Sequence, residues 1–176
     1  MVHDMPERYR YHISNEELER RWSAVRAKMT EQDIDCLVIN GYDNMLGGYL
    51  RWFTDIPLAD YPLSVLFHRE DEMTFIGHGG VGTRSIAAEL ARGVGGAPAT
   101  PMMPTLCYTA RYVPDLMIES IKRRNYRKVG FVALATIPAS MYKYLTEELG
   151  GVEFVDATEL VDYIKAIKSP EEIERI

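Results

Sequence analysis

Short apolar runs alternate with segments of helical periodicity along most of this chain, and this alternation limits the folds open to it. The strand-like runs cover residues 36–39, 64–68, 72–76, 128–132 and 152–155. Strands that alternate with helices predict an α/β sheet. Only three residues separate the runs at 64–68 and 72–76, and this spacing predicts an antiparallel hairpin. We therefore expect an α/β fold with a mixed, partly antiparallel central sheet of about five or six strands and helices on both faces.

The clearest helical pattern follows Ser14. Leu18, Trp22, Val25 and Met29 repeat at helical spacing, which predicts a helix over 15–32 with one buried stripe. Ser14 and Glu17 have the spacing of a capping box, in which each residue satisfies the other's backbone N–H. Further helices are expected at 83–92, 114–124, 138–149 and 158–163, a short aromatic strand at 49–53, a loop at 98–104, and a short strand at 106–110.

The last residues carry a second set of helix-start signals. Ser169 is an N-cap residue, Pro170 suits the first helical position, and Glu172 completes a capping box. The sequence stops about two turns later, too soon for such a helix to be stable alone. We therefore expect residue 176 to lie inside a longer protein.

Composition excludes several classes of protein. The 176 residues suit one domain, and the net charge of −6 argues against nucleic-acid binding. No apolar run has transmembrane length, and the start lacks the apolar core of a signal peptide. Cys36 and Cys107 have no metal-site spacing, and Cys36 is expected to be a buried thiol. This cysteine usage favours a reducing cytoplasm. The net charge and the lack of a long apolar run predict no nucleic-acid or membrane partner.

One glycine-rich segment suggests an alternative function. Gly77 to Gly82 match G-x-G-x-x-G, which can cradle a phosphate at the start of a helix. The strand before it belongs to the predicted hairpin, whereas the nucleotide fingerprint belongs to a βαβ unit. The acidic residue expected about 20 positions later is also missing, since residues 96–99 are Gly-Ala-Pro-Ala.

The polar residues form no catalytic pattern in the sequence. The histidines have no metal-ligand spacing and are expected at the surface or in turns: His3, His12, His68 and His78. Four loop carboxylates are expected to be solvated, as two pairs: Asp55 with Asp60, and Asp43 with Asp4. Five cations are expected to stay solvated near the end of a helix: Lys122, Arg123, Arg124, Arg127 and Lys128. No nucleophile–base motif is present either.

Several of these segments resemble one known family. The stretch Ile-Lys-Ser-Pro-Glu-Glu-Ile at 167–173 resembles the junction that opens the catalytic domain in creatinases, prolidases and aminopeptidases P. The run at 33–39 resembles the first strand of that family's N-terminal domain, and Asn44 followed by 49–54 is similar to its "N…YLtGf" segment. This chain has Arg51 and Trp52 where the family usually has one small residue. The resemblance spans residues 14–176.

The resemblance implies a division of the chain and a role for it. Residues 1–13 would be an N-terminal arm, 14–168 the creatinase/prolidase-like N-terminal domain, and 169–176 the start of the helix linking it to an absent C-terminal catalytic domain. The whole enzyme would cleave an Xaa-Pro peptide bond or a related C–N bond. A pair of divalent metals (Mn, Co or Zn) would be held in the absent catalytic domain, and no cofactor in this part.

The resemblance also implies partners and contact residues. The domain would be non-catalytic, would shape access to the active site, and would work with its own catalytic domain in a homodimer on a peptide or small amide substrate. Arg51, Trp52 and Tyr61 would contact substrate or the other subunit, since aromatic residues and arginine are typical anchors of interfaces. Two alternatives stay open: a small nucleotide- or phosphate-binding module using Gly77 to Gly82, and a family member that has lost catalysis and serves as an interaction domain.

Overall fold

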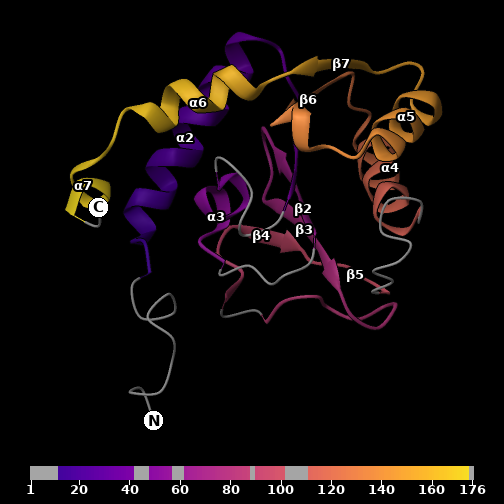
Figure 1. Cartoon of the computed structure of the whole chain (residues 1–176), viewed down its shortest axis with the longest axis horizontal. Helices are drawn as coiled ribbons and strands as arrows, with labels where there is room; N and C mark the ends of the chain where they lie inside the picture. Colours follow the sequence, from indigo (N-terminus) through magenta and orange to yellow (C-terminus); the bar gives the residue numbers. More distant parts are fainter. Residues whose placement is uncertain (1–11, 42–47, 57–61, 88–89, 102–110, 175–176) are drawn as a thin grey trace.

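A computed structural model describes residues 12–41, 48–56, 62–87, 90–101 and 111–174 (Figure 1). Within these ranges the strands form one sheet in the order β4-β3-β2-β1-β6-β7, with β5 paired to β3. The strands are β1 Cys36–Gly41, β2 Leu63–His68, β3 Met73–His78, β4 Val94–Gly96, β5 Ala99–Thr100, β6 Lys128–Val132 and β7 Glu153–Asp156.

The pairing of the strands confirms the mixed sheet. Strands β1, β2 and β3 are antiparallel, and the predicted hairpin is formed by β2 and β3. Strands β6 and β7 continue the sheet in parallel on the other side of β1, and β4 and β5 pair in parallel with β3. Parallel neighbours need crossover helices, which explains why helices lie between β1 and β6 and between β6 and β7.

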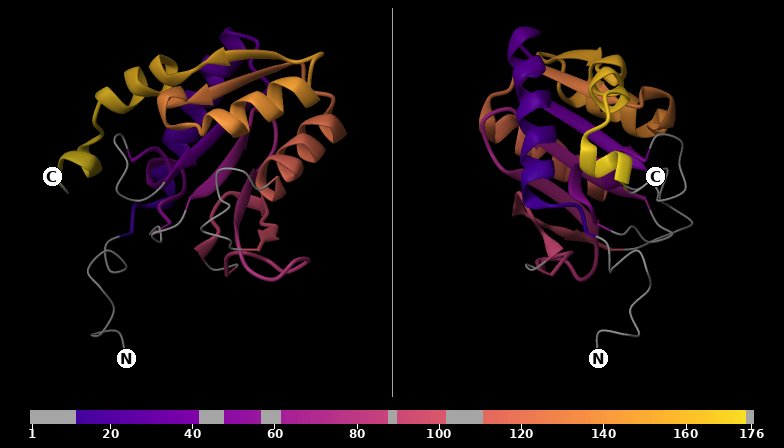
Figure 2. Two further views of the ribbon diagram at one scale, coloured as in Figure 1. Left: turned by 45° about the vertical axis from the view of Figure 1, so that its right-hand side comes forward. Right: turned by 90° about the vertical axis from the view of Figure 1, so that its left-hand side faces the viewer.

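Helices cover both faces of this sheet (Figures 1 and 2). They are α2 Asn15–Glu31, α3 Tyr49–Thr54, α4 Tyr112–Arg124, the short 3-10 helix η3 Leu134–Thr136, α5 Ala139–Glu148, α6 Thr158–Ala166 and α7 Pro170–Glu174. Helices α2, α3 and α6 share one hydrophobic cluster with the sheet, and α4 and α5 share another. No helix in the described ranges is long and apolar enough to cross a membrane.

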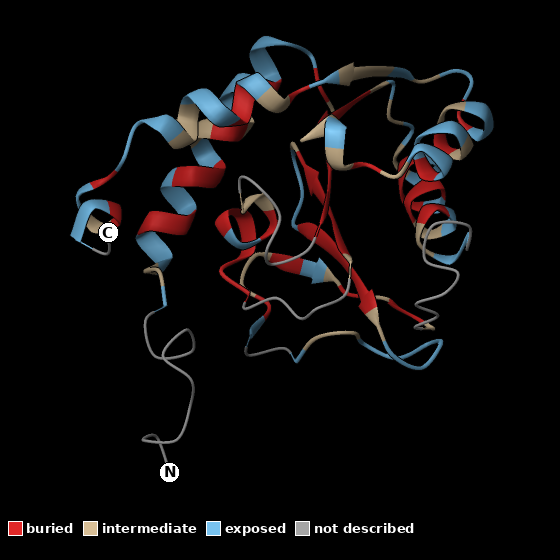
Figure 3. Ribbon diagram, viewed as in Figure 1, coloured by how far each residue is buried: buried red, intermediate tan, exposed pale blue. Residues whose placement is uncertain are grey.

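Strand β1 separates the two clusters. Its residues alternate between them: Leu37 and Ile39 belong to the α2 side, whereas Cys36 and Val38 belong to the α4 side. This alternation follows from the two-residue period of a strand. Every residue of β1 is buried, as the continuous apolar run predicted (Figure 3). The buried Cys36 thiol is also confirmed, and burial raises its pKa.

The predicted aromatic strand at 49–53 is wrong, because these residues form helix α3. Gly48 precedes the helix with a φ of 52°, and Asp55 ends it with the same φ, so left-handed residues stand at both ends. Leu50, Trp52 and Phe53 are buried, whereas Arg51 is exposed. Aromatic composition favours a strand locally. The surrounding helices and the left-handed ends favour one and a half turns of helix instead.

The predicted helix at 83–92 is also wrong within the residues described there. The Ser85 N–H donates to the Ala97 carbonyl at 2.8 Å, and the Ala99 N–H donates to the Thr83 carbonyl at 3.1 Å. Residues 83–85 are therefore hydrogen-bonded to residues 97–99 and do not form a helix. Strand β5 itself occupies part of the predicted loop at 98–104. Consequently Gly77 to Gly82 lead into turns and not into a helix N-terminus. The predicted strand at 106–110 lies outside the described residues.

Candidate functional site at the junction of α2, α3 and α7

Helix α7 begins with the capping box that the sequence predicted. The Ser169 N–H donates to Glu172 Oε2 at 3.0 Å, and the Glu172 N–H donates to Ser169 Oγ at 3.1 Å. Both residues are buried. The start of α7 is therefore packed against the rest of the domain, and its glutamates contact residues at the start of α2.

The capping box predicted for α2 needs a correction. The Glu17 N–H donates to Ser14 Oγ at 3.0 Å, as predicted. The Ser14 N–H, however, donates to Glu171 Oε1 at 2.9 Å, and Ser14 Oγ donates to Glu171 Oε2 at 2.5 Å. A glutamate of α7 thus replaces Glu17 as the reciprocal partner, because the Glu17 carboxylate is already bound by arginines of its own helix. The N-termini of α2 and α7 are joined directly.

Arg21 connects all three helices of the junction. It is 4 % exposed, and its Nε donates to Glu17 Oε1 at 2.7 Å. Its Nη2 donates to Glu172 Oε1 at 2.9 Å, and its Nη1 donates to the Trp52 carbonyl at 3.0 Å. The guanidinium carbon also lies 5.2 Å from the centre of the Trp52 ring. A planar guanidinium suits this site because it offers several donors in fixed directions.

Glu17 is held ionised in this cluster. Burial alone would raise its pKa, but hydrogen bonds from Arg20, Arg21 and Ser169 outweigh burial and lower the pKa to about 2. Arg20 contributes two of these bonds, at 2.7 and 2.9 Å, and also lies 3.5 Å from Glu172. The two glutamates and two arginines therefore form a charge-balanced group, which is the condition for burying ions without a large penalty.

The structure places two of the three predicted contact residues at this junction. Arg51 is exposed on α3. Trp52 is buried, packs edge-on against Phe53 at 5.1 Å between ring centres, and donates from Nε1 to Glu172 Oε1 at 3.3 Å. Tyr61 lies outside the described residues. The contact roles of Arg51, Trp52 and Tyr61 stay predictions.

Sequence reasoning missed the charged centre of this site. A signal was present, since Arg21 stands three residues after Leu18 and four before Val25, on the face that the apolar stripe buries. A charged residue at such a position needs a buried partner. Its partner Glu172 lies 151 residues further along the chain.

Two other predictions about polar residues are wrong. His68 is fully buried, with Nε2 3.0 Å from Thr74 Oγ1 and Nδ1 3.2 Å from the Tyr126 hydroxyl. Burial, followed by the nearby Arg124, lowers the pKa of His68 to about 4. Asp55 is 7 % exposed and not solvated: it accepts a hydrogen bond from Arg92 Nη2 at 2.5 Å and another from the Ile13 N–H at 2.9 Å.

The remaining polar candidates differ in exposure and in partners. His12 is exposed as predicted, but its Nδ1 lies 3.3 Å from Asp55 Oδ2. His78 is partly buried, with Nε2 2.8 Å from the Pro62 carbonyl oxygen. Of the five cations, Lys122, Arg123 and Arg127 are exposed. The other two are not fully solvated, because Arg124 pairs with Asp71 at 2.7 Å and Lys128 with Glu153 at 3.3 Å. His3, Asp4, Asp43, Asp60 and Cys107 lie outside the described residues.

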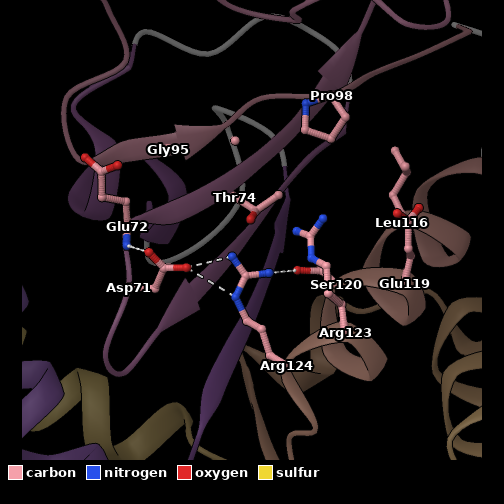
Figure 4. Close-up of a pocket in the computed structure, with 11 residues that line it drawn as sticks. Asp71, Glu72, Thr74, Gly95, Pro98, Leu116, Glu119, Ser120, Arg123 and Arg124 are labelled. Carbon is pink, nitrogen blue, oxygen red and sulfur yellow. Dashed lines mark hydrogen bonds and ion pairs between the residues drawn. The ribbon is translucent and has the colours of Figure 1, made fainter.

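A shallow pocket of about 430 Å³ lies on the opposite side of the sheet (Figure 4). It lies between α4, the β2–β3 turn and β4, and Arg124 bridges Asp71 and Ser120 along one side. Its charged side chains carry both signs: Asp71, Glu72, Glu119, Arg123 and Arg124. Across the described part of the chain, no group of three or more His, Cys, Asp or Glu residues is arranged to hold a metal ion.

The family model for the creatinase/prolidase N-terminal domain matches residues 21–167, so the chain belongs to this family. This confirms the resemblance that the sequence motifs indicated. A search of curated proteins found no match.

Solved structures share the fold at low sequence identity. The Xaa-Pro dipeptidase from Bacillus anthracis has a TM-score of 0.62 at 18 % identity, and the match covers 89 % of this chain and 38 % of that one. The prolidase from Thermococcus sibiricus gives 0.64 at 12 %, with 89 % and 39 % covered. The N-terminal domain of the cytoplasmic peptidase PepQ from Mycobacterium tuberculosis gives 0.58 at 17 %, with 82 % and 98 % covered. The chain thus spans less than half of the two longer proteins and nearly all of the isolated domain.

Proposed function

We propose that this chain is the non-catalytic N-terminal domain of a metal-dependent hydrolase of the Xaa-Pro dipeptidase or creatinase type. The observation that carries the proposal is the family match over residues 21–167, together with the 38 % and 39 % coverage of the longer dipeptidase and prolidase. In this proposal a following catalytic domain would hold two divalent metals (Mn, Co or Zn), which would activate water and polarise the scissile carbonyl. The protein works in the cytoplasm.

The junction supports a positioning role for the domain. Arg21 binds the α3 backbone and Glu172 of α7 at once, so α3 and α7 are held in one arrangement. Arg51 is exposed on α3, next in sequence to the Trp52 that Arg21 contacts, and would reach substrate or the second subunit of a homodimer, pairing with a carboxylate there. The buried Trp52 would hold α3, and with it Arg51, in position, and Tyr61 would belong to the same contact. The domain would then limit the size of substrate that enters the active site.

The test is expression of the gene extended past Ile176. Hydrolysis of a proline dipeptide with added Mn²⁺ is expected from the extended protein and not from the 176-residue chain. Turnover by the 176-residue chain would contradict the proposal. An extended protein with a folded second domain but no hydrolysis would instead favour the interaction domain that has lost catalysis.

Arg51 provides a second test in the extended protein. Arg51→Ala should weaken dimerisation or raise KM at least threefold, whereas Lys143→Ala on the exposed side of α5 should change neither. Unchanged dimer affinity and unchanged turnover in Arg51→Ala would remove the contact role. The phosphate-binding alternative has lost its support, because turns follow Gly77 to Gly82 in the described residues.

A further inference from the structure

The pocket between α4, the β2–β3 turn and β4 has no part in the proposed function. Its volume of about 430 Å³ falls within the range of small-molecule sites, which begins near about 300 Å³. Thr74 of β3 and Gly96 of β4 line it from the sheet, while Leu116 and Glu119 line it from α4 (Figure 4). Walls from separate elements therefore flank a space that can hold a molecule the size of one amino acid. We call this space the α4–β4 pocket.

One side of the α4–β4 pocket is closed by charges that neutralise each other. Arg124 Nη2 donates to Asp71 Oδ2 at 2.7 Å, and Arg124 Nη1 donates to Ser120 Oγ at 2.8 Å. The Asp71 carboxylate also accepts a hydrogen bond from the Glu72 N–H at 2.9 Å. These contacts hold α4 beside the β2–β3 turn. Asp71 and Arg124 are therefore part of the frame of the pocket, because each already has a partner of opposite charge.

Three other charged side chains of the pocket have no ion-pair partner among the described residues: Glu72, Glu119 and Arg123. Glu119 and Arg123 stand four residues apart on α4 and so lie on one side of the helix. Figure 4 shows the Arg123 side chain directed from α4 towards the sheet. Glu72 lies against β4, where a Cβ on Gly95 would be only 2.8 Å from Glu72 Oε2. Two carboxylates and one guanidinium are thus available to a ligand.

The sheet supplies a hydrogen-bond donor as well. Thr74 is 8 % exposed, and its Oγ1 lies 3.0 Å from Nε2 of His68, whose Nδ1 lies 3.2 Å from the Tyr126 hydroxyl. Burial lowers the pKa of His68 to about 4, so at neutral pH only one ring nitrogen carries a hydrogen. We assign Tyr126 as the donor to Nδ1, because a phenol is more acidic than an alcohol. The Nε2–H then donates to Thr74, whose own hydroxyl hydrogen is left for a ligand in the pocket.

We propose that the α4–β4 pocket binds an amino acid with a basic side chain. Arg123 and the Thr74 hydroxyl donate hydrogen bonds to the carboxylate of the ligand, and charge-assisted bonds of this kind are the strong ones. Glu72 and Glu119 accept from its two cationic groups. The five charged side chains of the pocket carry three negative and two positive charges, so a ligand of net charge +1 neutralises them. The proposal is independent of the proposed function, because it requires no residue outside this chain.

Calorimetric titration of the 176-residue chain with three matched probes tests the proposal. L-Lysine carries one carboxylate and two cationic groups, L-norleucine lacks the side-chain amine, and cadaverine lacks the carboxylate. We expect L-lysine to bind with a Kd below about 1 mM, and the other two probes to bind at least about tenfold more weakly.

Two substitutions identify the contacts. Arg123→Gln should weaken L-lysine binding about tenfold without weakening cadaverine binding, whereas Glu119→Gln should weaken both about tenfold. Both residues are exposed, and far-UV circular dichroism checks that the variants keep the fold. The matched controls are Arg127→Gln and Glu148→Gln, which change exposed residues of the same types outside the pocket and should leave all affinities unchanged.

Four results would overturn the proposal. The first is a Kd for L-lysine above about 10 mM. Equal affinities for L-lysine and cadaverine would show that the carboxylate is not recognised, and an unchanged affinity for L-lysine in Arg123→Gln would place its binding elsewhere. Tighter binding of inorganic phosphate than of L-lysine would identify an anion site at Arg123. None of these results depends on hydrolysis by the extended protein, so the proposed function is tested separately.

Discussion

Replacing Arg21 by methionine should destabilise the domain by about 3 kcal/mol. Methionine keeps the length of the side chain and removes its five donors, so Glu17 and Glu172 each lose a buried cationic partner. Breaking a buried ion pair from one side costs about 3–5 kcal/mol. The lower end applies here, because Glu17 keeps both bonds from Arg20 and Glu172 keeps the Ser169 N–H.

Urea unfolding of the 176-residue chain measures this change. Trp22 and Trp52 are the only two tryptophans, and Trp52 contacts the guanidinium, so fluorescence follows the junction while far-UV circular dichroism follows the whole fold. For a domain of this size, about 3 kcal/mol corresponds to a fall in Tm of roughly 6–12 °C. The control is Lys143→Met, whose exposed pair with Glu147 at 3.8 Å should contribute less than about 0.5 kcal/mol.

A double-mutant cycle separates the ion pair from other effects of the substitution. Once Arg21 is methionine, the Glu172 carboxylate has lost its main partner, so adding Glu172→Gln should cost about 1–3 kcal/mol less than it does in the natural chain. Additive losses would refute the reasoning, and so would a cost below about 1 kcal/mol for Arg21→Met alone.

Three further predictions follow from buried polar groups and one glycine. The pKa of His68 is about 4 in the folded chain and 6.5 when the side chain is free, so between these values the unfolded chain binds one more proton. The free energy of unfolding should therefore fall as pH drops from 6.5 towards 4. Urea titrations at pH 7 and pH 5 should show this loss, and an equal loss in His68→Gln would contradict the role of His68. Gly93→Ala should destabilise the domain by more than about 2 kcal/mol, because the φ of Gly93 is +64° and the new Cβ would lie 2.5 Å from the Trp22 ring. The control is Gly151→Ala, whose new Cβ would have no atom within 4 Å. Equal urea midpoints for the two variants would refute the argument. Arg92→Ala should cost about 2 kcal/mol, because the buried Asp55 loses its closest cationic partner and keeps only the Ile13 N–H and His12 Nδ1 at 3.3 Å. A loss under about 0.5 kcal/mol in thermal unfolding would show that Asp55 does not need Arg92.

Periodicity was sufficient to predict most of the sheet. The runs that became β1, β2, β3, β6 and β7 are apolar at strand length, and their pairing follows from the short turn and from the intervening helices. Strands β4 and β5 have three and two residues and carry no period. Helix α3 was missed because its aromatic residues favour a strand locally, while contacts with distant helices decide its conformation.

The candidate site was predictable only in its local parts. The cap at Ser169 depends on residues three positions apart, so the sequence alone indicates it. The bonds from Ser14 to Glu171 and from Arg21 to Glu172 join residues 157 and 151 positions apart. Such pairs depend on how the elements pack in three dimensions, which no local pattern records. The burial of His68 and Asp55 was missed for the same reason.

The bond between the starts of α2 and α7 has a consequence for synthesis of the protein. Helix α2, the first helix of the described residues, receives its capping partner from Glu171, near the end of the described residues. Until these residues leave the ribosome, Arg21 can bind only the carboxylate of Glu17 and not that of Glu172. The Ser14 N–H at the N-terminus of α2 also lacks the Glu171 carboxylate that accepts its hydrogen bond. The contacts between α2 and α7 can therefore form only late in translation, after the residues of α7 have left the ribosome.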